Sequence, residues 1–154
     1  IEWFMTDYEY HGKLNTYVKE LNEFYLKSPE LWEVDYSWKG FKWITNDDYE
    51  QNVIAFMRID KRGGNLIAVV NFSPVERQNY LIGTEEGIYT EVFNSNKVEY
   101  GGTGTGNKGR IISTRGSLHG YESFISLTLP PLSIIFLKKE NNINIEGGRI
   151  YEIC

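Results

Sequence analysis

The sequence predicts a mainly β protein, an antiparallel β-sandwich of about eight strands preceded by one helix. Three observations lead to this fold class. After residue 40 the apolar residues recur about every second position, in short segments rich in β-branched and aromatic residues. Turn residues separate these segments and no helical pattern lies between them, which favours antiparallel pairing over a parallel α/β sheet. Before residue 40, one segment follows the 3.6-residue period of a helix instead.

The helical segment spans residues 13–25. Its apolar side chains form a single stripe: Leu14, Tyr17, Val18, Leu21, Phe24 and Tyr25. Ser28 and Pro29 are expected to end the helix, because the residue before a proline is disfavoured in the α region. A stripe of this width has to pack against another surface, so we expect the helix to be the last one of a preceding domain.

The strand pattern continues to residue 138. The expected strands are 41–44, 52–58, 65–72, 80–82, 88–93, 110–113, 123–129 and 133–138. Gly63 and Gly64 indicate a hairpin turn between the second and third strands, since glycine adopts positive φ at little steric cost. Pro74, Gly87 and Pro130 mark later turns.

Composition and charge exclude several function classes. With 154 residues, 41% of them hydrophobic and 24% charged, the chain suits one globular domain, or one domain and a piece of another. The net charge of -5 is spread along the chain without a basic face, so we expect no nucleic acid partner. No apolar run approaches the roughly 20 residues of a membrane span, so we expect a soluble protein without a membrane partner. The single Cys154 is compatible with a reducing cytoplasm, and the start at Ile1 resembles the edge of a longer protein.

No motif in the sequence predicts a self-contained active site, a cofactor site or a metal site. Gly104, Gly106 and Gly109 match the dinucleotide pattern G-x-G-x-x-G. The pattern requires a buried strand before it and a helix after it, whereas residues 110–113 look like a strand, so we expect a flexible loop. His11, His119 and the remote cysteine do not have the spacing of zinc ligands.

Aromatic residues make up 15% of the sequence and offer candidate sugar contacts. An aromatic face can cover the apolar C–H face of a pyranose ring, although most of these rings should belong to the core or rim of a β fold. Trp38, Trp43 and Tyr100 lie next to glycines or at turns, and we take them as candidate glucan platforms.

Several short motifs occur in an order and spacing that resemble one enzyme family. They include Gly40-Phe41-Lys42-Trp43-Ile44, Asn71-Phe72-Ser73-Pro74, Gly106-Asn107, His119-Gly120 and Leu127-Thr128-Leu129-Pro130-Pro131. The ordered set resembles the C-terminal region of bacterial-type 1,4-alpha-glucan (glycogen) branching enzymes of the alpha-amylase superfamily. The resemblance covers residues 1–138.

The resemblance implies three parts of the chain. Residues 1–39 would be the C-terminal end of a catalytic (β/α)8 barrel, with the predicted helix as its last. Residues 40–138 would be a C-terminal all-β sandwich domain. Residues 139–154 form a tail beyond the family's usual ending and stay unassigned.

The resemblance also implies the reaction of the parent enzyme. The family transfers α-1,4-glucan segments to form the α-1,6 branches of glycogen, using an Asp nucleophile, a Glu acid/base and a second Asp. In the family's order all three precede Ile1, so the chain alone is expected to be an inactive structural or accessory domain. The expected partners are the catalytic barrel of its own parent chain and glycogen or linear α-1,4-glucan, and the expected location is cytoplasmic. Trp3 matches a family tryptophan near the rim of the glucan cleft and is a further candidate sugar contact.

Two alternatives remain open at this stage. The chain could act as a glucan-binding module, or its parent could be another alpha-amylase relative, such as a debranching or trehalose-forming enzyme. If the helix packs against a barrel, its stripe residues Leu14, Val18, Leu21 and Phe24 should be partly exposed in the chain alone.

Overall fold

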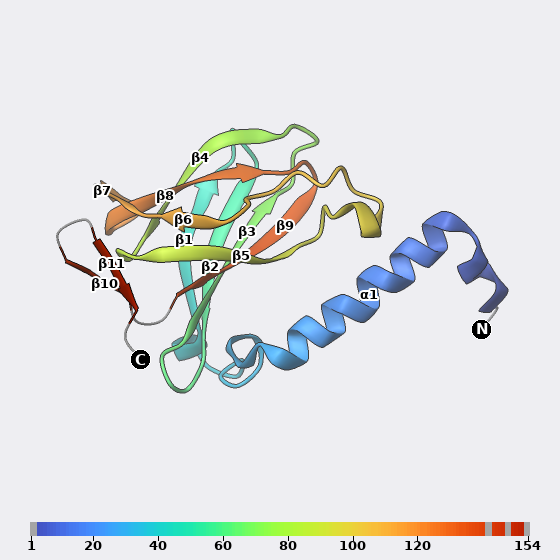
Figure 1. Cartoon of the computed structure of the whole chain (residues 1–154), viewed down its shortest axis with the longest axis horizontal. Coiled ribbons are helices and arrows are strands. Elements are labelled where there is room, and N and C mark those ends of the chain that lie inside the picture. Colours follow the sequence, from blue (N-terminus) through green and yellow to red (C-terminus); the bar gives the residue numbers. More distant parts are fainter. Residues whose placement is uncertain (1–2, 141–142, 147–148, 153–154) are drawn as a thin grey trace.

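The computed structural model describes residues 3–140, 143–146 and 149–152. One α-helix precedes a sandwich of two antiparallel sheets (Figure 1). The helical elements are the 3-10 helix η1 (Trp3–Asp7), the α-helix α1 (Glu9–Lys27), and the 3-10 helices η2 (Pro29–Leu31), η3 (Trp38–Gly40) and η4 (Val98–Tyr100). The strands are β1 (Phe41–Asp48), β2 (Val53–Ile59), β3 (Asn65–Asn71), β4 (Arg77–Thr84), β5 (Ile88–Asn94), β6 (Arg110–Ile112), β7 (Thr114–Leu118), β8 (Tyr121–Leu129), β9 (Ser133–Lys139), β10 (Ile143–Glu146) and β11 (Arg149–Glu152).

The two sheets contain nine of these strands. The larger sheet has the order β1-β2-β3-β9-β5-β6, and the smaller one has the order β4-β8-β7, with antiparallel pairing throughout. The predicted fold class is therefore confirmed, including the β2–β3 hairpin, in which Gly63 has a φ of 83°. Strands β10 and β11, in the unassigned tail, pair with each other, and the described residues show no pairing between them and either sheet.

Strand β7 is the main correction to the predicted element list. Residues 114–118 are not among the expected strands; Gly116 interrupts them and they carry little apolar alternation. In the structure β7 pairs with β8, and the ring of Phe124 lies over Gly116. A Cβ at Gly116 would lie 2.6 Å from Phe124 Cε1, so the glycine makes room for the ring of the partner strand.

The main core lies between the two sheets, and a second apolar cluster lies on the outer face of the larger sheet. Strand β3 serves both, because successive side chains of a strand point to opposite faces. Ile67 and Val69 belong to the core between the sheets, whereas Leu66 and Ala68 belong to the outer cluster. Both faces of the larger sheet are therefore covered where α1 crosses it.

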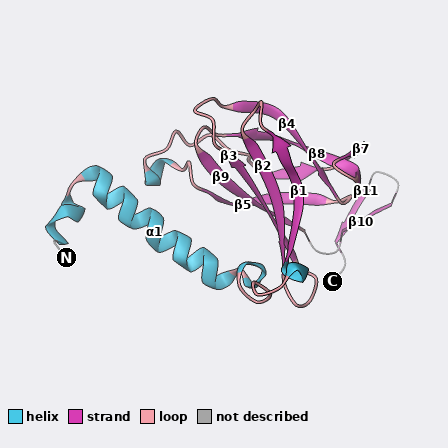
Figure 2. Cartoon of the chain, turned by 180° about the vertical axis from the view of Figure 1, so that it is seen from behind, coloured by secondary structure: helices cyan, strands magenta, loops and turns pink. Residues whose placement is uncertain are grey.

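Helix α1 packs on this outer face along one side of its stripe, and Figure 2 shows it beside the sandwich. The Phe24 ring lies 4.9 Å from that of Phe93 and 5.1 Å from that of Phe136, measured between centroids. Leu14 and Val18 lie on the other side of the stripe and remain 56% and 45% exposed. The outer half of the stripe, with Leu14 and Val18, is thus exposed, and the inner half, with Leu21 and Phe24, is partly buried against the sandwich of the same chain. All four residues therefore have the expected partial exposure. None of the helices in the described residues is both long and apolar enough to cross a membrane.

The glycine-rich loop before β6 joins the two sheets. Asn107 Nδ2 donates to a Glu91 carboxylate oxygen of β5 at 2.8 Å and to the Thr128 carbonyl of β8 at 2.9 Å. The Thr128 N–H in turn donates to Asn107 Oδ1 at 2.8 Å. The segment after this loop is strand β6, so the loop presents no helix N-terminus to a phosphate, and its role is to tie β5 to β8.

Candidate functional site

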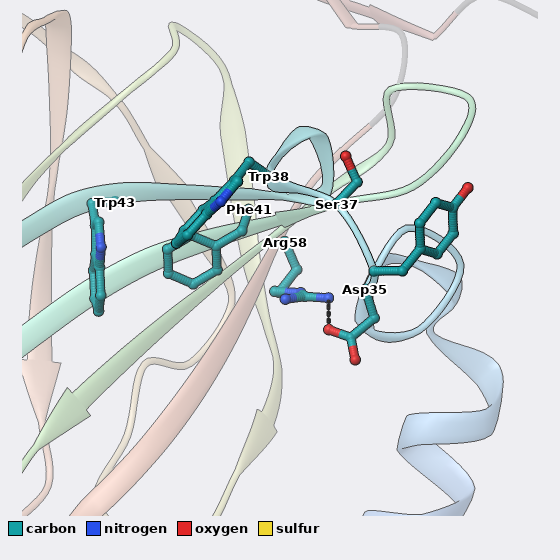
Figure 3. Close-up of a pocket in the computed structure, with 7 residues that line it drawn as sticks. Asp35, Ser37, Trp38, Phe41, Trp43 and Arg58 are labelled. Atoms are coloured by element: carbon teal, nitrogen blue, oxygen red, sulfur yellow. Dashed lines mark hydrogen bonds and ion pairs between the residues drawn. The ribbon is translucent and has the colours of Figure 1, made fainter.

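The predicted tryptophans Trp38 and Trp43 line one pocket of about 370 Å³ at the end of the larger sheet (Figure 3). Its lining combines four aromatic side chains with three polar ones. The lining residues are Asp35, Tyr36, Ser37, Trp38, Phe41, Trp43 and Arg58. Four further pockets among the described residues have no tryptophan in their lining.

Strand β1 and helix η3 position the aromatic side of the pocket. Phe41 and Trp43 are two residues apart on β1 and therefore share the outer face of the sheet. Their ring centroids are 4.9 Å apart and nearly perpendicular, while Trp38 from η3 makes an edge contact with Phe41 at 6.1 Å. Trp38 is 84% exposed and Trp43 is 45% exposed, so both rings can be reached from solvent.

Arg58 of β2 and Asp35 form the polar wall of the pocket. Arg58 Nη2 lies 2.6 Å from Asp35 Oδ1, and the guanidinium also lies over the Phe41 ring. The Arg58 side chain is only 13% exposed, whereas the Asp35 carboxylate is 67% exposed. The largely buried Arg58 side chain therefore holds the Asp35 carboxylate in place, and Asp35 presents a solvent-facing hydrogen-bond acceptor beside the tryptophans.

This combination of groups suits binding rather than catalysis. Exposed indole rings can cover an apolar face of a ligand, and a few fixed polar groups can pair with its hydroxyls. Retaining glycosyl transfer needs two carboxyl groups about 5 Å apart. Asp35 is the one carboxylate among the residues that line the pocket, and it is already paired with Arg58.

Tyr100 lies away from this pocket, between η4 and α1. Its ring stacks on Phe93 at 6.0 Å and meets Tyr17 edge-on at 5.2 Å, and its hydroxyl donates a hydrogen bond to the Glu20 carboxylate. Burial, followed by the hydrogen bond to Glu20, raises the pKa of the Tyr100 hydroxyl above its usual value. These contacts give Tyr100 a structural role in holding α1, and its role as a glucan platform stays a prediction.

The remaining sequence candidates lie elsewhere or outside the described residues. Trp3 begins η1, and its side chain is outside the part that the structure describes. His119 lies in the turn between β7 and β8, where its Nδ1 accepts the Gly83 N–H at 3.1 Å. Within the described residues, no three or more His, Cys, Asp or Glu side chains are grouped so that they could hold a metal ion.

Sequence reasoning missed the polar half of the pocket. Asp35 and Arg58 are 23 residues apart, and no local pattern links them. One signal was available in β2, where Arg58 interrupts an otherwise apolar strand on the outer face. A charged residue in such a strand indicates a partner or a ligand nearby.

Comparisons with known proteins agree with this architecture. Residues 43–140 match the family model described as alpha amylase, C-terminal all-beta domain. Relatives named 1,4-alpha-glucan branching enzyme GlgB are 40% identical over 146 residues in Prochlorococcus marinus (94% of this chain, 19% of the relative) and 42% identical over 142 residues in Aquifex aeolicus (91% and 22%). The relative of that name from Halothermothrix orenii is 43% identical over 143 residues (92% and 23%). The chain thus spans about a fifth of the length of these relatives.

Proposed function

The chain belongs to the family of alpha-amylase C-terminal all-β domains, and from this premise we propose that it is the C-terminal part of a 1,4-alpha-glucan branching enzyme. The relatives that share about 40% of its residues over more than 90% of its length carry that name. In this proposal the parent enzyme transfers α-1,4-glucan segments to form the α-1,6 branches of glycogen in the cytoplasm. The catalytic carboxylates belong to the rest of the parent chain, and this part is inactive alone and needs no cofactor.

The proposed division of labour follows the three parts of the chain. Residues 1–39, with α1, complete the catalytic barrel, and residues 40–138 form an accessory sandwich. The tail 139–154 has no assigned role. The sandwich holds the last barrel helix in place and thereby stabilises the catalytic domain.

The observation that carries this proposal is the outer half of the α1 stripe. Leu14, Val18 and Tyr25 are 56%, 45% and 46% exposed and lie on one side of the helix, next to the side that packs on the sandwich. Complete burial of one such side chain is worth about 2 kcal/mol, so covering these half-exposed groups would contribute roughly 1 kcal/mol each. A chain that spans a fifth of its relatives has a large partner available, namely the rest of its own parent.

A paired substitution tests this docking. Leu14→Ser combined with Val18→Ser should lower the unfolding temperature of the parent enzyme by several degrees and leave that of the isolated chain almost unchanged, because these side chains are exposed there. The matched control is Phe24→Ala, on the side that contacts Phe93, which should destabilise the isolated chain itself. Equal effects of the paired substitution on both proteins, or no effect on the parent, would contradict the docking proposal.

We propose glucan binding at the pocket of Trp38 and Trp43 as a second function of this part. The supporting observation is that two exposed indole rings flank Phe41, beside the Asp35 acceptor. A site of this kind would hold a remote segment of the polymer and raise its concentration near the catalytic centre.

Titration with maltoheptaose, followed by tryptophan fluorescence and heat, tests the glucan site. Trp38→Ala and Trp43→Ala should each raise Kd about tenfold, since one stacked ring contributes about 1.5 kcal/mol. Tyr49→Ala serves as the matched control, because Tyr49 is about as exposed as Trp38, at 82% against 84%, but does not line the pocket. Absence of any heat or fluorescence change at millimolar maltoheptaose would count against the site while leaving the docking proposal intact.

The parent's linkage specificity distinguishes a branching enzyme from a debranching or trehalose-forming relative. Incubation of linear α-1,4-glucan with the parent enzyme should produce new α-1,6 linkages, which proton NMR resolves. Release of linear chains from glycogen, or of a non-reducing disaccharide, would assign the parent to one of the other classes.

A further inference from the structure

The segment that joins α1 to β1 also builds most of the aromatic pocket. This linker, residues 28–40, supplies Asp35, Tyr36, Ser37 and Trp38 to the pocket wall, and it contains η2 directly after α1. Figure 3 shows the linker between the pocket and the last turns of the helix. The pocket and the helix are therefore attached to the same stretch of chain.

Arg58 contacts the linker at two places, at η2 and at Asp35. Its Nη2 group lies 2.6 Å from Asp35 Oδ1 on the pocket side and donates to the Leu31 carbonyl at 3.2 Å on the helix side. Its Nε group donates to the Glu30 carbonyl at 3.4 Å. One planar guanidinium on β2 thus fixes the pocket wall and the carbonyls of η2 at the same time.

Other contacts fasten the linker to the sandwich without reaching the pocket. The Glu30 carboxylate is 1% exposed and pairs with Lys138 of β9 at 2.7 Å. The Lys61 N–H donates to Glu33 Oε2 at 3.2 Å. These two contacts hold η2 and the residues after it on the sandwich. The Arg58 contacts differ from them because Arg58 also lines the pocket.

We propose that Arg58 is a positioning residue that couples ligand binding in the pocket to the seating of α1 on the sandwich. This inference rests on the proposed glucan-binding function of the pocket. A glucan that contacts Trp38, Trp43 and Asp35 binds only while the linker is docked, so it disfavours local opening of the linker. Because Arg58 joins Asp35 to η2, the same ligand also disfavours release of the C-terminal turns of α1.

The size of this coupling follows from mass action. A ligand that binds only the docked state lowers the population of the open state by a factor of one plus its concentration relative to Kd. At a ligand concentration of about ten times Kd, linker amides and the last turns of α1 should exchange with solvent about tenfold more slowly. Ligand binding in the pocket would thus also stabilise α1, the helix whose outer face the parent's catalytic domain is proposed to cover.

Amide hydrogen exchange of this chain with and without maltoheptaose tests the coupling. In the unsubstituted protein, residues 20–27 of α1 and residues 28–38 of the linker should both gain about tenfold protection. In Arg58→Met, maltoheptaose should still protect the linker near Trp38 but should no longer protect the helix.

Lys138→Met is the matched control, since it loosens η2 without touching the pocket. It should raise exchange of the helix in both states and keep the ligand-dependent gain. A role of Arg58 in stability alone would give the same pattern for Arg58→Met and Lys138→Met, and this outcome overturns the inference. Protection of the linker without protection of α1 in the unsubstituted protein overturns it as well, whereas absence of any fluorescence change refutes glucan binding itself.

Discussion

Asn107 holds the two sheets together, and its truncation should be among the most damaging single substitutions in the sandwich. Its side-chain amide donates to Glu91 of β5 and to the Thr128 carbonyl of β8, and its carbonyl oxygen accepts from the Thr128 N–H. Asn107→Ala removes all three hydrogen bonds. The hydrogen bond from the Asn107 backbone N–H to Glu91 remains possible.

The loss in unfolding free energy follows from the strengths of these three hydrogen bonds. The two hydrogen bonds to Thr128 are worth about 1 kcal/mol each, and the one to the Glu91 carboxylate about 2 kcal/mol. Asn107 is only partly buried, so hydrogen bonds to water will replace part of the lost interaction energy. The net loss in unfolding free energy should be about 3 kcal/mol. For a domain of this size, about 3 °C per kcal/mol gives a fall in Tm of about 9 °C.

Thermal unfolding by circular dichroism measures this loss, with urea unfolding as a second measurement. Lys108→Ala is the matched control, because the neighbouring Lys108 is exposed in the same loop and its truncation should change Tm by less than about 1 °C. If Asn107→Ala and Lys108→Ala lower Tm equally, the loop does not join the sheets in the way described.

Two further substitutions test the same region and the smaller sheet. Gly106→Ala would place a Cβ 2.3 Å from Asn94 Nδ2, so it should lower Tm by several degrees, and an unchanged Tm in the same unfolding experiment would mean that the loop moves freely. Burial lowers the pKa of His119 from its ordinary value of 6.5. The folded state therefore favours the neutral imidazole, and this contribution to stability is present above pH 6.5 and is lost as the pH falls through the lowered pKa. The Tm of the unsubstituted protein should therefore fall more between about pH 7 and about pH 5 than that of His119→Asn, and parallel pH profiles would show that His119 does not contribute.

The sequence predicted the sandwich because its strands are apolar on a regular period, and it missed β7 because that strand has no such pattern. Residues 114–118 pair with β8 through their backbone, and Gly116 contributes by lacking a side chain under Phe124. The helix was predicted from its stripe. The division of the stripe into a half that packs on Phe93 and an exposed half depends on how the sheet lies under α1, and no helical periodicity contains that information.

The candidate site was predicted on its aromatic side only. Trp38 and Trp43 are near each other in sequence, and the η3 turn with one strand step brings them to a common pocket. Arg58 and Asp35 come together through the pairing of β1 with β2 and the path of the linker, which are tertiary features. Tyr100 was selected because it precedes a glycine; its ring contacts Tyr17 and Phe93, and the sequence pattern did not indicate these contacts.

Hydroxyl-radical footprinting of α1 tests the central proposal, that this chain docks on the rest of a branching enzyme through the outer half of its helix. Tyr25 is 46% exposed and Leu14 is 56% exposed in the chain alone, so both should be labelled there. In the parent enzyme their labelling should fall several-fold, while Tyr49, which is 82% exposed on the far turn of β1, keeps its labelling. Equal labelling of Leu14 and Tyr25 in the isolated chain and in the parent enzyme would contradict the account.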